Sequence, residues 1–176
     1  ASCAVAVPGA EDAPFFGAVW FTAPPGPRDP RVAWRDRERP PLPGNFRAQH
    51  DSDNGFLKVR DEKLAAWARD PEVVRDQLAE YYGLIEHLDA ALGRVLAAVD
   101  ARGGERETII VYAADHGLAV GSHGLLGKQS VYEHSLRAPM MISGPGIPEG
   151  VHLTALTYLY DLYPTLLGLV DAGIEE

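Results

Sequence analysis

The longest periodic stretch of the chain, residues 70–102, constrains the fold more than any other part. Asp70 can cap a helix, Pro71 suits the first helical position, and the negative charge of Glu72 is favourable at a helix N-terminus. The spacing predicts an amphipathic helix of about eight turns, ended by Gly103-Gly104. Its apolar face recurs at steps of three and four and consists of Val74, Leu78, Tyr81, Leu84, Ile85, Leu88, Leu92, Val95 and Val99.

Short apolar runs on both sides of this helix predict strands. Residues 107–115 read ETIIVYAAD and do not alternate, which is typical of a strand buried on both faces of a mainly parallel sheet. Residues 14–21, PFFGAVWF, indicate a second buried strand, and residues 138–146, APMMISGPG, a third. Residues 153–173 predict a strand or loop that leads into an amphipathic helix. Strands and helices in this order predict an α/β layer architecture.

Two segments lack any such pattern. Residues 23–45 contain seven prolines, which predicts a long loop. Residues 45–64 have mixed charge and a turn signal at Asn54-Gly55, which predicts a polar loop. A calcium-binding helix–loop–helix is disfavoured there, because Phe56 stands where that pattern needs a glycine.

Composition excludes several classes of protein. The 176 residues are 46% hydrophobic, enough for one domain with a sizeable core. The net charge of −9 argues against a nucleic-acid partner, and the basic stretch at 31–40 is interrupted by acidic residues. A single cysteine, Cys3, excludes an internal disulfide framework and a Cys-rich zinc site. No run approaches the roughly 18 apolar residues of a membrane span, so we expect no span, and the first ten residues do not resemble a signal peptide.

The ionisable residues of greatest interest lie in a glycine-rich stretch, AADHGLAVGSHGLLGK, at 113–128. Asp115 and His116 follow the predicted strand, and ligands collect at the carboxyl ends of strands in α/β sheets. Their oxygen and nitrogen atoms could share a divalent cation, and Gly117 would let the chain turn away from it. Two ligands do not complete a site, and such a pair alone is more typical of a turn-forming aspartate beside a surface histidine.

Lys128 changes the interpretation of this stretch. A lysine in a glycine-rich loop is a point charge suited to an oxyanion, so the loop combines candidate ligands for a cation and an anion. His123 could bind substrate or could brace the loop through hydrogen bonds. A surface helix with local ion pairing is predicted from the helical spacing of Tyr132, Glu133 and Arg137.

The stretch at 108–147, TIIVYAADHGLAVGSHGLLGKQSVYEHSLRAPMMISGPGI, resembles the second signature region of the sulfatases, members of the alkaline-phosphatase-like superfamily. In that region a strand delivers Asp-His or Asp-Asn to a metal, and Gly-Lys follows. Weaker similarity extends to PFFGAVWFTAP, NFRAQHDSDNGFLKVRDEKL, HLDAALGRVL and YLYDLYPTLLGL. The resemblance implies that residues 1–176 are a central-to-C-terminal part of a sulfatase catalytic domain. The implied fold is an incomplete alkaline-phosphatase-like sandwich, with a mainly parallel sheet flanked by helices.

The resemblance also implies a chemistry. A formylglycine hydrate made from Cys or Ser attacks the sulfur of a small-molecule or saccharide sulfate ester, while calcium and cationic side chains stabilise the sulfuryl oxygens. Asp115 and His116 would be ligands of the calcium ion, and Lys128 would contact the sulfate or its leaving oxygen. Histidine is an unusual ligand for calcium, so a softer divalent ion is chemically possible.

The sequence departs from the family pattern at the nucleophile. The motif of Cys or Ser followed by x-Pro-x-Arg is absent: Ala4-Val5-Ala6-Val7 follows Cys3, and the stretch from Ser143 has Ile147 in place of arginine. The paired acidic metal ligands of the family are also missing from these residues. We therefore expect the 176-residue polypeptide to be inactive by itself.

A second departure is Pro25, which stands where relatives commonly have a histidine near the scissile bond. Loss of such a group would lower the rate by about 10² to 10⁴. Two alternatives to a sulfatase stay open. One is a phosphatase, phosphodiesterase or phosphoglycerate-mutase relative, because these share the sheet and an Asp-His metal step. The other is a non-catalytic, degenerate relative of the sulfatases, for which Pro25 is the best evidence.

Overall fold

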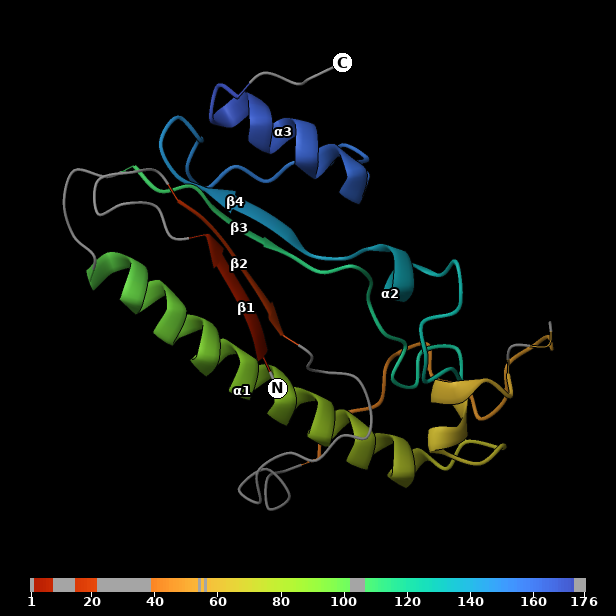
Figure 1. Ribbon diagram of the computed structural model, residues 1–176. Helices are drawn as coiled ribbons and strands as arrows, with labels where there is room; N and C mark the ends of the chain where they lie inside the picture. The colour runs from red at the N-terminus through yellow and green to blue at the C-terminus, as the bar shows by residue number, and fades with distance from the viewer. Residues whose placement is uncertain are drawn as a thin grey trace.

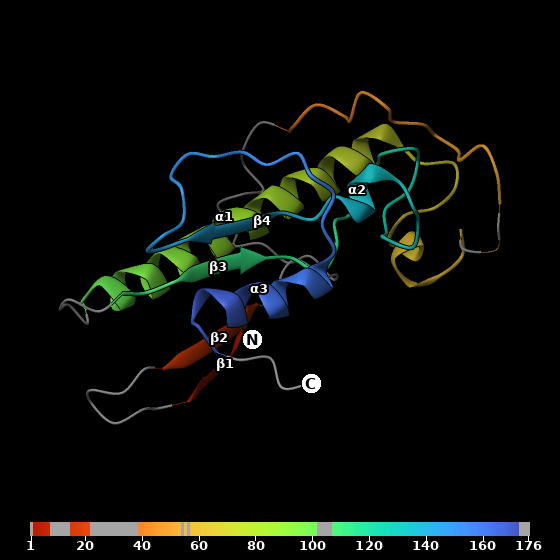
Figure 2. The ribbon, with the colours of Figure 1, turned by 90° about the horizontal axis from the view of Figure 1, so that it is seen from above.

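A computed structural model describes residues 2–7, 15–21, 39–53, 55, 57–101 and 107–172, the first of these ranges by its backbone alone. Helices α1 and α3 lie on opposite sides of the β3–β4 strand pair (Figures 1 and 2). The loops gather around the N-terminal end of α1. In chain order the elements are β1 (Ser2–Val7), β2 (Phe16–Phe21), η2 (Arg60–Leu64), α1 (Pro71–Ala101), β3 (Ile110–Ala113), α2 (Glu133–Leu136), β4 (Met140–Ser143), η3 (Leu159–Asp161) and α3 (Leu162–Leu169).

Helix α1 confirms the prediction from the periodic stretch. Asp70 caps it, because its Oδ1 accepts a hydrogen bond from the backbone N–H of Glu72 at 2.8 Å. Its apolar face is buried only near the start, at Val74 and Leu78, whereas Ile85 is 39% exposed. The predicted glycine stop lies outside the described residues.

The predicted strands are present, but both described pairings are antiparallel. β1 pairs with β2 from Ser2 opposite Phe21 to Val7 opposite Phe16. β3 pairs with β4 from Ile110 opposite Ser143 to Ala113 opposite Met140. β1 was not predicted, although its valines are typical of a strand. The described residues thus show mixed helices and small antiparallel sheets, and a mainly parallel sheet stays a prediction.

The predicted burial of the strands is wrong within this chain. Phe16 and Trp20 of β2 are 63% and 58% exposed, and β3 is only half-buried. Each strand has its extensive contacts with one partner strand, and α1 and α3 flank the β3–β4 pair without burying it. An apolar run shows what a strand is suited to, but burial also requires a second layer to pack against it.

The core of the described residues joins α1 to the loops. Its buried members are Val74 and Leu78 from α1 and Val120 and Leu126 from the glycine-rich stretch. The side chains packed around them are Leu42, Phe46, Ala65, Tyr81 and Leu118. The glycine-rich stretch is therefore an integral part of the core.

The two predicted loops are only partly described. Residues 39–45 of the proline-rich loop contain no helix or strand, and residues 22–38, with Pro25, lie outside the described residues. The polar loop 45–64 contains η2, a 3-10 helix that was not predicted. Gly55 has a φ of 89°, as the predicted turn requires, while Asn54 is outside the described residues.

The C-terminal part confirms the predicted helices. α3 follows the irregular segment 151–158, and α2 forms where helical spacing predicts it. The local ion pairing predicted for α2 is wrong, because in the described chain neither Glu133 nor Arg137 has an ion pair. No helix in the described ranges combines the length and the apolar character needed to cross a bilayer.

Candidate active site

The glycine-rich stretch begins where the β3–β4 pair ends. The N–H of Ala114 donates to the carbonyl oxygen of Pro139 at 3.1 Å, and the N–H of Gly117 donates to Ser135 at 2.9 Å. Asp115 and His116 are thus held between two backbone contacts. A Cβ atom at residue 117 would lie 1.9 Å from the carbonyl oxygen of His134. The glycine is therefore required for close packing against α2, and not for the turn that the sequence suggests.

The structure brings together Asp115, His116 and Lys128. The Oδ2 atom of Asp115 lies 3.2 Å from Nε2 of His116, which also contacts the ammonium group of Lys128. Because an ammonium group can only donate, Nε2 accepts this hydrogen bond, and Nδ1–H donates to the carbonyl oxygen of Gly117 at 2.9 Å. Both the tautomer and the direction of the imidazole are set by these contacts.

The side chains of Asp115 and His116 are arranged in a way that suits a cation. A carboxylate oxygen and an imidazole lone pair lie side by side, and positive charge close to them offsets their mutual repulsion. Mixed oxygen and nitrogen donors are ligands for divalent cations, and metal-binding histidines usually donate their other N–H to a carbonyl or carboxylate, as His116 does. Asp115 and His116 therefore fit a cation as a partial ligand set. Within the described ranges no group of three or more His, Cys, Asp or Glu gathers to complete it.

A buried ion pair lies against the segment that precedes Lys128. The side chains of Arg69 and Glu62 form this pair and are 0% and 5% exposed. Glu62 accepts hydrogen bonds from the N–H groups of Leu126 and Gly127, and Arg69 donates to the carbonyl oxygen of Gly124 at 2.9 Å. Burial lowers the pKa of Arg69, and the charge of Glu62 opposes that shift.

His123 makes contacts within the loops. Its Nε2 lies 3.2 Å from the side-chain amide nitrogen of Asn45, and its ring stacks on Tyr132 with centroids 4.1 Å apart. The hydroxyl of Tyr132 contacts Nε2 of His50 at 3.1 Å. These aromatic groups connect the loop around residue 50 to the glycine-rich stretch. Burial lowers the pKa of the neighbouring His134, and His123 adds to the shift.

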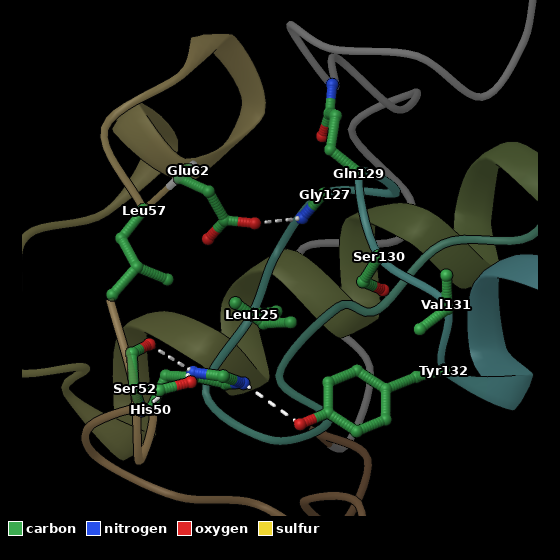
Figure 3. A pocket seen from close by; sticks show the side chains of 10 residues that line it. All are labelled: His50, Ser52, Leu57, Glu62, Leu125, Gly127, Gln129, Ser130, Val131 and Tyr132. Atoms are coloured by element: carbon green, nitrogen blue, oxygen red, sulfur yellow. Dashed lines mark hydrogen bonds between the residues drawn. The ribbon is translucent and has the colours of Figure 1, made fainter. Parts of the chain in front are cut away.

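Figure 3 shows a hollow beside this cluster, with His50 and Tyr132 at one end and Glu62 directed at the backbone of Gly127. Lys128 is not among its lining residues; its side chain contacts His116. The residues that line the hollow are His50, Ser52, Leu57, Glu62, Leu125, Gly127, Gln129, Ser130, Val131 and Tyr132.

The sequence indicates the ionisable residues of the glycine-rich stretch but not the residues that hold this stretch in place. Glu62 and Arg69 belong to charged segments that are typical of solvated loops, and no periodic pattern marks them as buried. The sequence places Tyr132 on a surface helix, yet its ring contacts three histidines, His50, His123 and His134. The only signal in the sequence was indirect: Glu62 lies within the stretch that resembles a sulfatase loop.

Comparisons with known proteins agree on one family. A family model described as Sulfatase matches residues 25–172. An arylsulfatase of Clostridium perfringens is 30% identical over 172 residues, which cover 93% of this chain and 35% of that protein. A sulfatase of Formosa agariphila is 30% identical over 169 residues, which cover 89% of this chain and 32% of that protein. A choline-sulfatase of Rhizobium meliloti is 37% identical over 105 residues, 60% of this chain and 20% of that protein.

Two of these relatives match most of this chain, and the chain spans about a third of the length of each. No solved structure matches it.

Proposed function

Since this chain belongs to the sulfatase family, we propose that the complete protein hydrolyses sulfate esters and that residues 1–176 form part of its catalytic domain. The observation that carries this proposal is the convergence of Asp115, His116 and Lys128 after the end of β3. Candidate ligands for a cation and for an anion meet there on one short loop. The finer fold, a mainly parallel alkaline-phosphatase-like sandwich, is part of the same proposal.

The proposed role of Asp115 and His116 is to hold a divalent cation, which we propose to be calcium. When bound, the cation would supply positive charge to the sulfuryl oxygens of the ester. His116 has one lone pair at Nε2, which it can offer either to the cation or to Lys128. If that lone pair held the cation, the ammonium group of Lys128 would be free to contact a sulfuryl or leaving-group oxygen.

Other parts of the site have to come from outside these residues. The Cys/Ser-x-Pro-x-Arg nucleophile motif is absent from the sequence of this chain, so the proposal requires a formylglycine supplied by another part of the complete protein. For His123 we propose bracing of the loop in preference to substrate binding. Its contacts with Asn45 and Tyr132 support that choice.

The reaction is tested with paired substrates. The complete protein is assayed on an aryl sulfate and on the aryl phosphate with the same leaving group. We expect a higher kcat/KM on the sulfate. A preference for the phosphate would instead support a phosphatase-type member of the superfamily. Failure to hydrolyse either substrate, or a range of sulfate esters, would support a non-catalytic relative, as Pro25 suggests.

The cation is tested separately by titration. Calcium is added to the metal-free complete protein and to its Asp115→Ala variant, and heat release on binding is recorded. We expect the variant to bind calcium at least about tenfold more weakly. Asp100, which is exposed on α1, provides the matched control in Asp100→Ala. Equal affinities for all three proteins would exclude Asp115 as a ligand, and tighter binding of Mn²⁺ or Zn²⁺ would show a softer ion.

A further inference from the structure

The buried ion pair of Glu62 and Arg69 holds the backbone of the glycine-rich stretch at two places. On one side Arg69 donates from Nε to the carbonyl oxygen of Gly124 at 2.9 Å. On the other side Glu62 accepts from the N–H of Gly127 at 2.8 Å, and both of its oxygens lie 3.1 Å from the backbone nitrogen of Leu126. The pair thus fixes residues 124–127 immediately before Lys128.

The pair makes many hydrogen bonds and is almost completely buried. Arg69 also donates to the carbonyl oxygens of Glu62 and Ala65, and its guanidinium lies 3.6 Å from the ring centroid of Trp67. Side chains pack closely against Gly127, where a Cβ atom would lie 2.7 Å from Oε1 of Gln129 and 3.0 Å from Oε1 of Glu62. The position of the loop is therefore determined by contacts on several sides.

Stability alone does not account for such a pair. Removing two charges from water is costly, and well-packed apolar residues in place of a buried ion pair often leave a protein equally stable or more stable. The distinctive property of this pair is directional: its hydrogen bonds set where the backbone of Gly124, Leu126 and Gly127 lies. The next residue is Lys128, whose ammonium group contacts His116.

We propose that Glu62 and Arg69 are positioning residues for Lys128. They act through the backbone of residues 124–127, which aims the ammonium group of Lys128 at the anion. Neither side chain contacts the substrate in this role. The inference rests on the proposed sulfatase function, and it adds two residues that the resemblance to the family does not assign.

The test is a double-mutant cycle in the complete protein, with kcat/KM on an aryl sulfate as the measured quantity. The first variant is Glu62→Gln, which has the same shape but places an NH₂ donor against N–H groups of the loop or of Arg69. The second is Lys128→Ala, and the third combines both. We expect Glu62→Gln to lower kcat/KM by about 100-fold, the effect of a misplacement near 1 Å. In the Lys128→Ala background the same substitution should change it by less than about twofold.

Each outcome has a distinct meaning. If Glu62→Gln lowers kcat/KM by the same factor in both backgrounds, the pair does not act through Lys128, and the positioning role is excluded while the sulfatase function stands. If Lys128→Ala leaves kcat/KM unchanged, the proposed role of Lys128 and the positioning role of the pair both fail, while hydrolysis of sulfate esters stands. A purely structural role would lower the melting temperature in both backgrounds without producing this coupling.

A second variant keeps the test decisive if Glu62→Gln does not fold. Arg69→Lys retains the positive charge that Glu62 needs, but one ammonium group cannot replace the fork that joins Gly124 to Glu62. It is expected to show the same loss and the same coupling to Lys128. The matched control is Glu72→Gln, in an exposed pair with Arg75, which should leave kcat/KM unchanged in both backgrounds.

Discussion

The loop cluster, residues 39–53, 57–70 and 114–137, differs sharply from the C-terminal region, residues 138–172. The buried hydrophobic residues of the described chain lie in the loop cluster and the first turns of α1. In the C-terminal region no described residue is buried, even though it contains β4 and α3. Leu126 of the loop cluster is 0% exposed, whereas Leu153 and Leu156 are 77% and 102% exposed.

Regular structure and tight packing are therefore separate properties in this molecule. From residue 114 on, the glycine-rich stretch forms no helix or strand, but backbone hydrogen bonds within it, the Glu62–Arg69 ion pair, aromatic contacts and apolar side chains hold it in place. β4 and α3 have regular backbones, but no neighbouring described element buries their apolar side chains. A site on the glycine-rich stretch is therefore pre-organised to an extent that its irregular backbone does not suggest.

The largest effect is expected in the core of the loop cluster. Leu126→Ala should lower the free energy of unfolding of the complete protein by about 4 kcal/mol, because a fully buried leucine leaves a cavity. Val131→Ala, five positions further and 85% exposed, should change it by less than about 0.5 kcal/mol. Urea denaturation measures both. Equal losses would show that the loop cluster is not packed as described.

A glycine-to-alanine substitution in each region compares their packing directly. Gly117→Ala should cost about 3 kcal/mol, because the new Cβ would meet a backbone oxygen. Gly168→Ala in α3 meets nothing within 4 Å, and alanine should stabilise the helix there by about 0.5–1 kcal/mol. Thermal unfolding of the complete protein distinguishes the two signs. A large loss at Gly168 would contradict the difference between the two regions, since it would require a layer over α3 from outside the described residues.

The helix cap predicts a smaller effect. Asp70→Ala removes the side-chain oxygen that accepts the N–H of Glu72, so it should lower the free energy of unfolding by about 1 kcal/mol. Asp70→Asn keeps an acceptor and should recover most of that loss. Both are measured by urea denaturation. If the alanine variant were as stable as the parent protein, the start of α1 would not be fixed by its cap.

The smallest effect is a pH dependence from His134. Burial, together with His123, lowers the pKa of His134 in the folded protein. The unfolded chain therefore binds a proton more readily, and this contribution to stability, present above the unfolded pKa of about 6.5, is lost as the pH falls through the folded pKa. His134→Gln should flatten the decrease of stability between about pH 7 and pH 5, and exposed His152→Gln should not. Identical curves for the parent protein and His134→Gln would contradict the assignment.

The sequence predicted the positions of helices and strands better than it predicted which segments pack against them. Hydrophobic periodicity and the Asp70-Pro71 start located α1, and apolar runs located β2, β3 and β4. Burial and strand direction were predicted wrongly or stay untested, because both depend on which other segments cover a strand. Such partners are far apart in the sequence and leave no periodic signal in the strand itself.

The sequence predicted the ionisable residues of the candidate site but not the residues that support them. The spacing of Asp115, His116 and Lys128 drew attention to a loop at the end of a strand, and the structure brings these three together. The supports in Glu62 and Arg69 could not be predicted from their own residue types, because charged residues are usually solvated. Their burial follows from tertiary contacts with the glycine-rich stretch, across more than 50 positions of sequence.

The most direct test of the central claim compares two lysines of the complete protein by kcat/KM on an aryl sulfate. Lys128→Ala should lower kcat/KM by about 10² to 10³, the usual effect of removing one group that stabilises developing negative charge. Lys58→Ala, in an exposed position of the loop cluster, should leave it unchanged. If both variants retain the kcat/KM of the parent protein, the glycine-rich stretch is not a wall of a sulfate-ester site.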